Sequence, residues 1–142
     1  SIKNTHWKIF AKKQEQWVFV KEKLDLKPVT LWIDQSIDDP KEKSEQYEYM
    51  LSDVFSMIND NMFQNIIINN KVYKTDTDKK EIISLIVNLK NEEFKLSDDL
   101  NNIMHCHNIV FLTVNNENNV KYTEIFKELK SKNINVRIFK YE

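Results

Sequence analysis

Glycine is missing from this sequence altogether, with none in 142 residues where about ten are expected. Backbone positions with positive φ must therefore use the next most tolerant residue, asparagine, of which there are 17. Asparagines stand where we expect turns and helix ends, at Asn69-Asn70, Asn115-Asn116, Asn118-Asn119 and Asn133. A coding bias toward Asn, Lys and Ile explains this abundance equally well, and both explanations can hold together.

The absence of glycine and the scarcity of arginine exclude several functions. The motifs GxxxxGK[ST], GxGxxG and GxSxG each need glycine, so we expect no P-loop ATPase, standard dinucleotide binding or α/β-hydrolase chemistry. Arg137 is the one arginine beside 20 lysines. Because bidentate recognition of guanine or phosphate relies on arginine, sequence-specific DNA binding is not expected.

Long apolar runs and cysteine pairs are also missing. No run approaches the roughly 18 residues that span a bilayer, and no signal-peptide pattern opens the sequence. Cys106 is the single cysteine, which permits no internal disulfide and fits a reducing compartment. We therefore expect one cytoplasmic domain over residues 1–142 without membrane association. Ser1 is either a processed start or a boundary within a longer chain.

The clearest positive pattern lies in residues 108–141, which predict a strand, a helix and a second strand. Residues 108–114 are apolar and β-branched, 115–119 form a turn cluster, and 134–141 are again β-rich. The helix between them has an apolar face at Tyr122, Ile125, Phe126 and Leu129. A strand, crossover helix and strand of this length make a parallel βαβ unit.

The middle of the chain predicts further alternation. Residues 28–34 favour a central strand, because they are apolar on both faces. Asp39, Pro40 and Glu42 form a capping-box pattern. The helix they begin should run to about residue 61, with a buried side made by Tyr47, Leu51, Val54, Phe55 and Ile58. A hairpin (63–68 with 72–74), a helix from Asp78 and a short helix from Ser97 should then lead to residue 108.

These elements together predict an α/β domain with a mainly parallel sheet and helices on both faces. Antiparallel strands are possible in residues 1–27. The outline resembles flavodoxin-like or receiver-like folds, and residues 31–40 are similar to the receiver strand that ends in an acid before a helix. A receiver also has paired acids at that strand end and a later aspartate and lysine, which have no counterpart here. The resemblance implies an outline only.

Residues 1–27 combine aromatic residues with seven lysines against three acids. Interleaved lysines and aromatics, here including Trp7 and Trp17, are typical of single-stranded nucleic-acid binders. More often, however, such a pattern belongs to an edge strand with its lysines in water. Nucleic-acid binding is therefore an alternative and not the favoured function.

Two groups of residues could carry chemistry. If strands 28–34 and 108–114 are neighbours, Asp34, Asp38 and Glu117 would share one crevice. Clustered carboxylates without arginine are typical of Mg²⁺-dependent nucleases and phosphoryl-transfer enzymes, which is our alternative prediction. The triplet 105–107 (His-Cys-His) suggests a metal or nucleophile site, but it precedes its strand, whereas such sites gather at the carboxyl ends of strands. We instead expect Cys106 to be buried there.

The favoured prediction is a non-enzymatic protein-interaction module with no cofactor. Residues 34–60 carry eight acids and two lysines, and Glu42, Glu45 and Glu48 should line one exposed helix side. With Asp38 and Tyr49 they would bind a basic protein partner. Such a module could be an immunity- or antitoxin-type inhibitor, or a regulatory or assembly domain of a longer chain.

Overall fold

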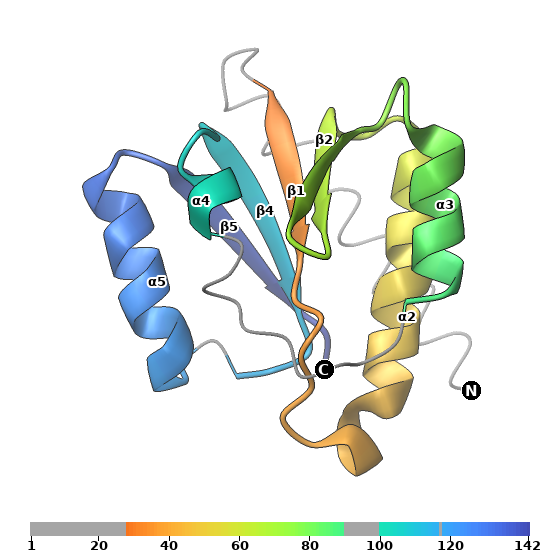
Figure 1. Cartoon of the computed structure of the whole chain (residues 1–142). Helices are drawn as coiled ribbons and strands as arrows, with labels where there is room; N and C mark the ends of the chain where they lie inside the picture. The colour runs from red at the N-terminus through yellow and green to blue at the C-terminus, as the bar shows by residue number, and fades with distance from the viewer. Residues whose placement is uncertain (1–27, 90–99, 117) are drawn as a thin grey trace.

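The structure, a computed structural model, describes residues 28–89, 100–116 and 118–142. Its centre is a five-stranded sheet in the order β3-β2-β1-β4-β5 (Figure 1). The strands are β1 (Val29–Ile33), β2 (Asn65–Ile68), β3 (Lys71–Lys74), β4 (Asn108–Thr113) and β5 (Asn135–Lys140). β3 is antiparallel to β2, and the other neighbours are parallel. The predicted α/β class with a mainly parallel sheet is confirmed.

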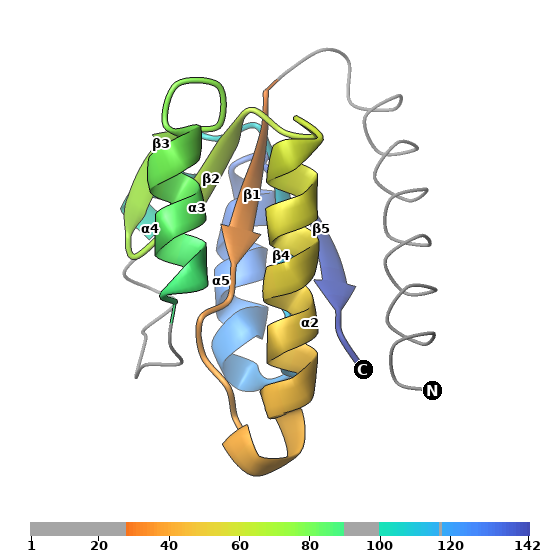
Figure 2. The ribbon, with the colours of Figure 1, turned by 90° about the vertical axis from the view of Figure 1, so that its right-hand side faces the viewer.

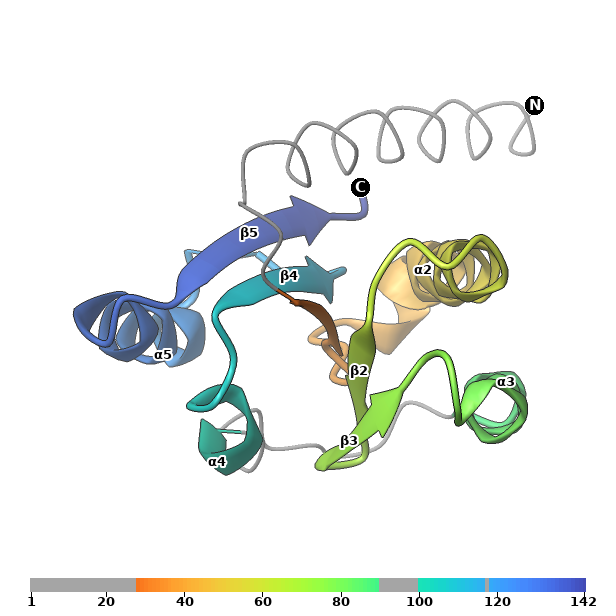
Figure 3. The ribbon, with the colours of Figure 1, turned by 90° about the horizontal axis from the view of Figure 1, so that it is seen from above.

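Helices cover both faces of the sheet. Figure 3 shows α2 (Pro40–Asn59) and α3 (Lys79–Val87) on one face, and α4 (Leu100–Ile103) and α5 (Val120–Ser131) on the other. Every residue of β1 is buried, as predicted for a central strand. Leu31 and Ile33 pack into the core under α2 and α3, and Trp32 packs into the core under α5. Because successive side chains of a strand point to opposite faces of the sheet, β1 contributes residues to both cores.

The helix starts follow the sequence signals. The Asp39 carboxylate accepts the backbone N–H of Glu42 at 3.3 Å, and Pro40 occupies the first helical position. Asn119 caps α5 in the same way through the N–H of Lys121. One prediction for α2 is wrong: Phe55, expected on the buried side, is 38% exposed.

Asparagine takes the backbone conformations that glycine usually takes. Within the described ranges, the residues with positive φ are Asn61, Asn69, Asn70 and Asn133, at 50–60°. This confirms the prediction for Asn69, Asn70 and Asn133. Asn69 and Asn70 connect β2 to β3, and two successive positive φ angles are what a type I′ hairpin turn requires.

The connections reverse direction between β1 and β4. From β1 the chain passes through α2 to β2, and from β4 it passes through α5 to β5 on the opposite face (Figure 1). In open α/β sheets, such a reversal leaves a crevice at the carboxyl ends of the two strands, where ligands commonly bind. The segments after β1 and β4 are therefore the first place to look for a site.

One prediction falls outside this description, and another is tested only within it. The strands expected in residues 1–27, with Trp7 and Trp17, lie outside the described residues. Among the residues that the structure describes, no helix is long and apolar enough to cross a membrane.

Candidate functional sites

The first candidate site is built on Asp34, which directly follows β1 and is fully buried. Its Oδ1 accepts hydrogen bonds from the N–H and the hydroxyl of Ser36, at 3.1 and 2.6 Å. Its Oδ2 accepts from the hydroxyls of Thr113 and Tyr122, at 2.6 and 2.5 Å, and from the Asn115 amide at 3.0 Å. Five hydrogen bonds to one carboxylate offset the cost of burying its charge.

Asn115 joins the two segments that leave the sheet edge. Its Nδ2 donates to Asp34, to the backbone oxygen of Ser36 at 3.0 Å and to the Tyr122 hydroxyl at 2.8 Å. Its Oδ1 accepts the N–H of Asp38 at 2.8 Å. An amide can both donate and accept, so one buried asparagine fixes the path between β1 and α2.

Asp38 and Lys121 form an ion pair at the rim of this site. Lys121 Nζ lies 2.9 Å from Asp38 Oδ1, and the two side chains are 39% and 44% exposed. Burial lowers the pKa of Lys121, but its hydrogen bond and charge interaction with Asp38, together with Tyr122, outweigh this and raise it. Half-exposed pairs of this kind contribute little stability. The pair nevertheless occupies Asp38, which is the more exposed of the two predicted metal ligands that the structure describes.

The structure describes two of the three acids of the predicted cluster. β1 and β4 are neighbours, as the alternative prediction required, and Asp34 and Asp38 lie on one segment beside Asn115. Glu117 lies outside the described residues. Within the described ranges, no group of three His, Cys, Asp or Glu side chains could hold a metal ion. What the geometry favours for Asp34 is a structural role, because donors from the protein already occupy both oxygens.

The second candidate, residues 105–107, lies between α4 and β4, at the amino ends of the parallel strands. His105 and His107 are exposed. Cys106 is half-buried, so the prediction of a buried cysteine is wrong, because this residue lines a cavity and is not enclosed by the core. Burial still raises the pKa of its thiol. A cavity of about 470 Å³ adjoins the triplet, lined also by Pro28, Thr30, Asn65, Val72 and Asn102.

The third candidate is the side of α2 that carries Glu42, Glu45 and Glu48, which we call the acidic face. All three glutamates are exposed, as predicted. The Tyr49 hydroxyl donates to Glu45 at 2.5 Å, and this hydrogen bond raises the pKa of Tyr49. Tyr49 is half-buried beside them. The opposite side of α2 packs into the core through Met50, Val54 and Ile58, so the acidic face is held on a fixed support.

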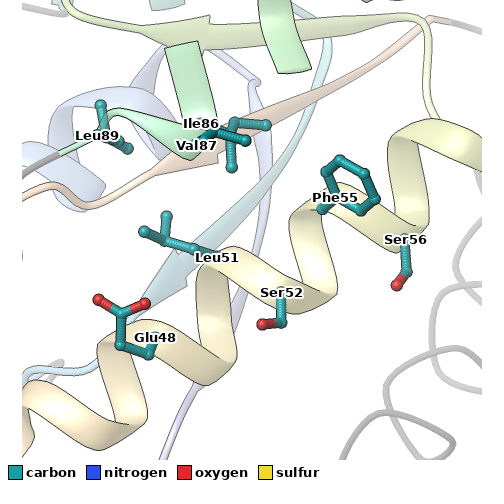
Figure 4. A pocket seen from close by; sticks show the side chains of 8 residues that line it. All are labelled: Glu48, Leu51, Ser52, Phe55, Ser56, Ile86, Val87 and Leu89. Carbon is teal, nitrogen blue, oxygen red and sulfur yellow. The ribbon is translucent and has the colours of Figure 1, made fainter. Parts of the chain in front are cut away.

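A groove between α2 and α3 continues from the acidic face, and the sequence did not predict it. The two helices run antiparallel (Figure 2), and the groove has a volume of about 370 Å³. Figure 4 shows its lining: Glu48, Leu51, Ser52, Phe55 and Ser56 from α2, and Ile86, Val87 and Leu89 from α3 and the segment after it. Val87 is 71% exposed although it lies beside other apolar side chains. The available signal was Phe55, which was predicted on the buried side of α2 and instead lines this groove.

The fold and these sites define the protein as an α/β domain with a satisfied polar cluster at its sheet edge and an acidic helix beside an apolar groove. No protein-family model matches the chain, and neither a curated protein nor a solved structure matches it. Function must therefore be argued from the chemistry of these residues.

Proposed function

We propose that this protein is a non-enzymatic interaction module that binds a basic protein partner through the acidic face of α2. The observation that carries the proposal is the state of Glu42, Glu45 and Glu48. All three are exposed, and none has an ion-pair partner within the part of the chain that the structure describes.

The spacing of these glutamates explains why a basic partner would be attracted to them. Residues three apart on a helix are neighbours on its surface, and like charges there repel one another. A lysine- or arginine-rich surface relieves that repulsion, speeds encounter and fixes orientation. Tyr49, held against Glu45, supplies an aromatic group of the kind enriched at interfaces.

Both kinds of protein that would use such a face need a rigid acidic surface. An immunity- or antitoxin-type inhibitor would cover the basic active site of a toxin. A regulatory or assembly domain would dock on a basic neighbour. The buried residues of α2 support either, because they hold the helix that carries the three glutamates in place before the partner arrives.

The proposal is tested by an amide NMR titration of the full chain with an oligolysine peptide. We expect shifts that concentrate on residues 38–52 and weaken as salt is raised, since salt screens exposed charges. The variant Glu45→Gln/Glu48→Gln should lose most of these shifts. The matched variant Glu124→Gln/Glu128→Gln, on the exposed side of α5, should keep them. Shifts that are spread evenly over the surface, or that survive in the α2 variant, contradict the proposal.

A second candidate function is a divalent-metal-dependent enzyme at the sheet edge, with Asp34, Asp38 and Glu117 as ligands of Mg²⁺. It is supported by the pairing of β1 with β4, which brings the segments after these strands together. The hydrogen bonds on Asp34 and the ion pair of Asp38 weigh against it. We therefore rank it below partner binding.

A further inference from the structure

Binding through the acidic face alone makes no use of the groove between α2 and α3. Leu51 and Ile86 are buried and form its base, whereas Phe55 and Val87 are exposed at 38% and 71%. Contact with water at these side chains is unfavourable, and covering them would stabilise a complex.

We infer that this groove binds the apolar side of a basic amphipathic helix from a protein partner. The inference rests on the proposed function and deepens it by stating what the partner presents. A helix laid in a groove between two helices, with apolar anchors at positions i, i+3 or i+4 and i+7, is a recurring recognition mode.

The charges around the groove select a basic helix. Glu48 is itself part of the lining, and Glu45 lies one turn before it on the same helix. Among the residues that the structure describes, none of those lining the groove is a lysine or arginine. A lysine next to the apolar side of the partner helix would therefore meet Glu48 while its neighbours enter between Phe55 and Val87.

The dimensions also fit a helix. On α2 the lining runs from Glu48 to Ser56, eight residues apart, or about 12 Å at 1.5 Å per residue. That length matches about two turns of a partner helix, which is enough for anchors from i to i+7. A small ligand fits less well, because small-molecule sites need polar groups that converge in an enclosed cavity. Here the polar side chains among the described lining residues, Glu48, Ser52 and Ser56, lie along one helix.

The test uses the full chain and three labelled 18-residue peptides measured by fluorescence anisotropy. The first has leucine and lysine at helical spacing, the second is its scrambled sequence, and the third replaces lysine by glutamate. We expect the first peptide to bind at least about tenfold more tightly than the second, because only a continuous apolar side fills the groove. The third should not bind measurably.

Two matched pairs of variants locate the binding. Ser52→Trp places a large side chain in the groove and should weaken binding of the first peptide by about tenfold, whereas Ser52→Ala should leave it unchanged. Val87→Ser should weaken binding by roughly fivefold through lost apolar contact. Val120→Ser, at a valine that is 72% exposed on α5, should have no effect.

The outcomes separate the inference from the proposed function. If Glu45→Gln/Glu48→Gln weakens binding but Ser52→Trp and Val87→Ser do not, the acidic face binds partners and the groove inference is wrong. If the carboxylate variant has no effect either, the proposed function fails as well. Self-association of the chain that Ser52→Trp abolishes, or NMR contacts from residues 1–27 to Phe55 and Val87, would show another occupant and overturn the inference.

Discussion

The hydroxyl of Tyr122 on α5 donates a hydrogen bond to Asp34 Oδ2, at 2.5 Å and across 88 positions of sequence. Both residues are fully buried. Burial raises the pKa of Tyr122, and the charge of Asp34 raises it further, so this tyrosine keeps its proton to higher pH than an ordinary tyrosine. This contact joins the last crossover helix to the end of the central strand.

Tyr122→Phe should lower the free energy of unfolding by about 2 kcal/mol, because a hydrogen bond to a buried carboxylate is lost. Urea denaturation followed by circular dichroism measures this. Tyr73→Phe is the control, since the described part of the chain gives the Tyr73 hydroxyl no hydrogen bond. It should change stability by less than about 0.5 kcal/mol. Equal losses in the two variants would contradict a stabilising role for the contact.

The metal-dependent alternative makes a separate prediction. Because Asp34 is enclosed and Asp38 is paired with Lys121, we expect millimolar Mn²⁺ to broaden amide signals near Asp34 no more than near Asp60 and Asp76, two exposed acids elsewhere. An NMR titration with Mg²⁺ and then Mn²⁺ measures this. Broadening that converges on Asp34, Asp38 and Glu117 would instead establish a carboxylate site.

Much of the fold could be predicted because its signals are local. Asp39 and Pro40 specify a helix start through short-range hydrogen bonding and a fixed φ angle. Residues 28–34 indicate a central strand because they are apolar on both faces. The neighbouring positions of β1 and β4 could only be stated as a condition, since strand order depends on contacts between residues far apart in the chain.

The candidate sites were less predictable, for two different reasons. The exposed positions of Glu42, Glu45 and Glu48 follow from helical spacing alone, so they were predicted. The groove depends on where α3 lies against α2, which spacing within either helix does not specify. Asp34 was identified as a candidate ligand, but its role depends on Thr113, Asn115 and Tyr122, which the chain brings to it only on folding.

Tyr141 provides a prediction on alkaline pH. Its hydroxyl donates to Asp53 Oδ2 at 2.6 Å, and burial, followed by the charge of Asp53, raises its pKa well above the ordinary value near 10. The folded protein therefore holds this proton more tightly than the unfolded chain. The resulting stability is fully present below pH 10 and is lost as the pH rises from there toward the folded-state pKa.

Tyr141→Phe lacks this proton, so the gap in unfolding free energy between the wild-type protein and the variant should narrow above pH 10. The expected narrowing is up to about 1.4 kcal/mol per pH unit. Urea denaturation at pH 8, 10 and 11 measures it, with far-UV circular dichroism at pH 11 as a check that both proteins remain folded. A gap that stays constant from pH 8 to 11 would show that the proton on Tyr141 is not linked to folding.

The last prediction concerns the use of asparagine in place of glycine. Asn133 follows the end of α5 with φ at 59°, and its N–H bonds to the carbonyl of Lys130 at 3.0 Å. Positive φ is energetically unfavourable for a residue with a Cβ, and it is less unfavourable for asparagine than for alanine. Asn133→Ala should therefore destabilise the protein by about 1 kcal/mol, whereas Asn133→Gly should be neutral or stabilising by a few tenths.

Lys132→Ala is the matched control for Asn133→Ala, because Lys132 is the adjacent exposed residue and its φ is −98°. It should change the unfolding free energy by less than about 0.5 kcal/mol. Thermal and urea denaturation of the three variants measure the order Gly, Asn, Ala at position 133. If alanine is tolerated there as well as glycine, the conformation is not what selects asparagine, and the coding bias becomes the better explanation for its abundance.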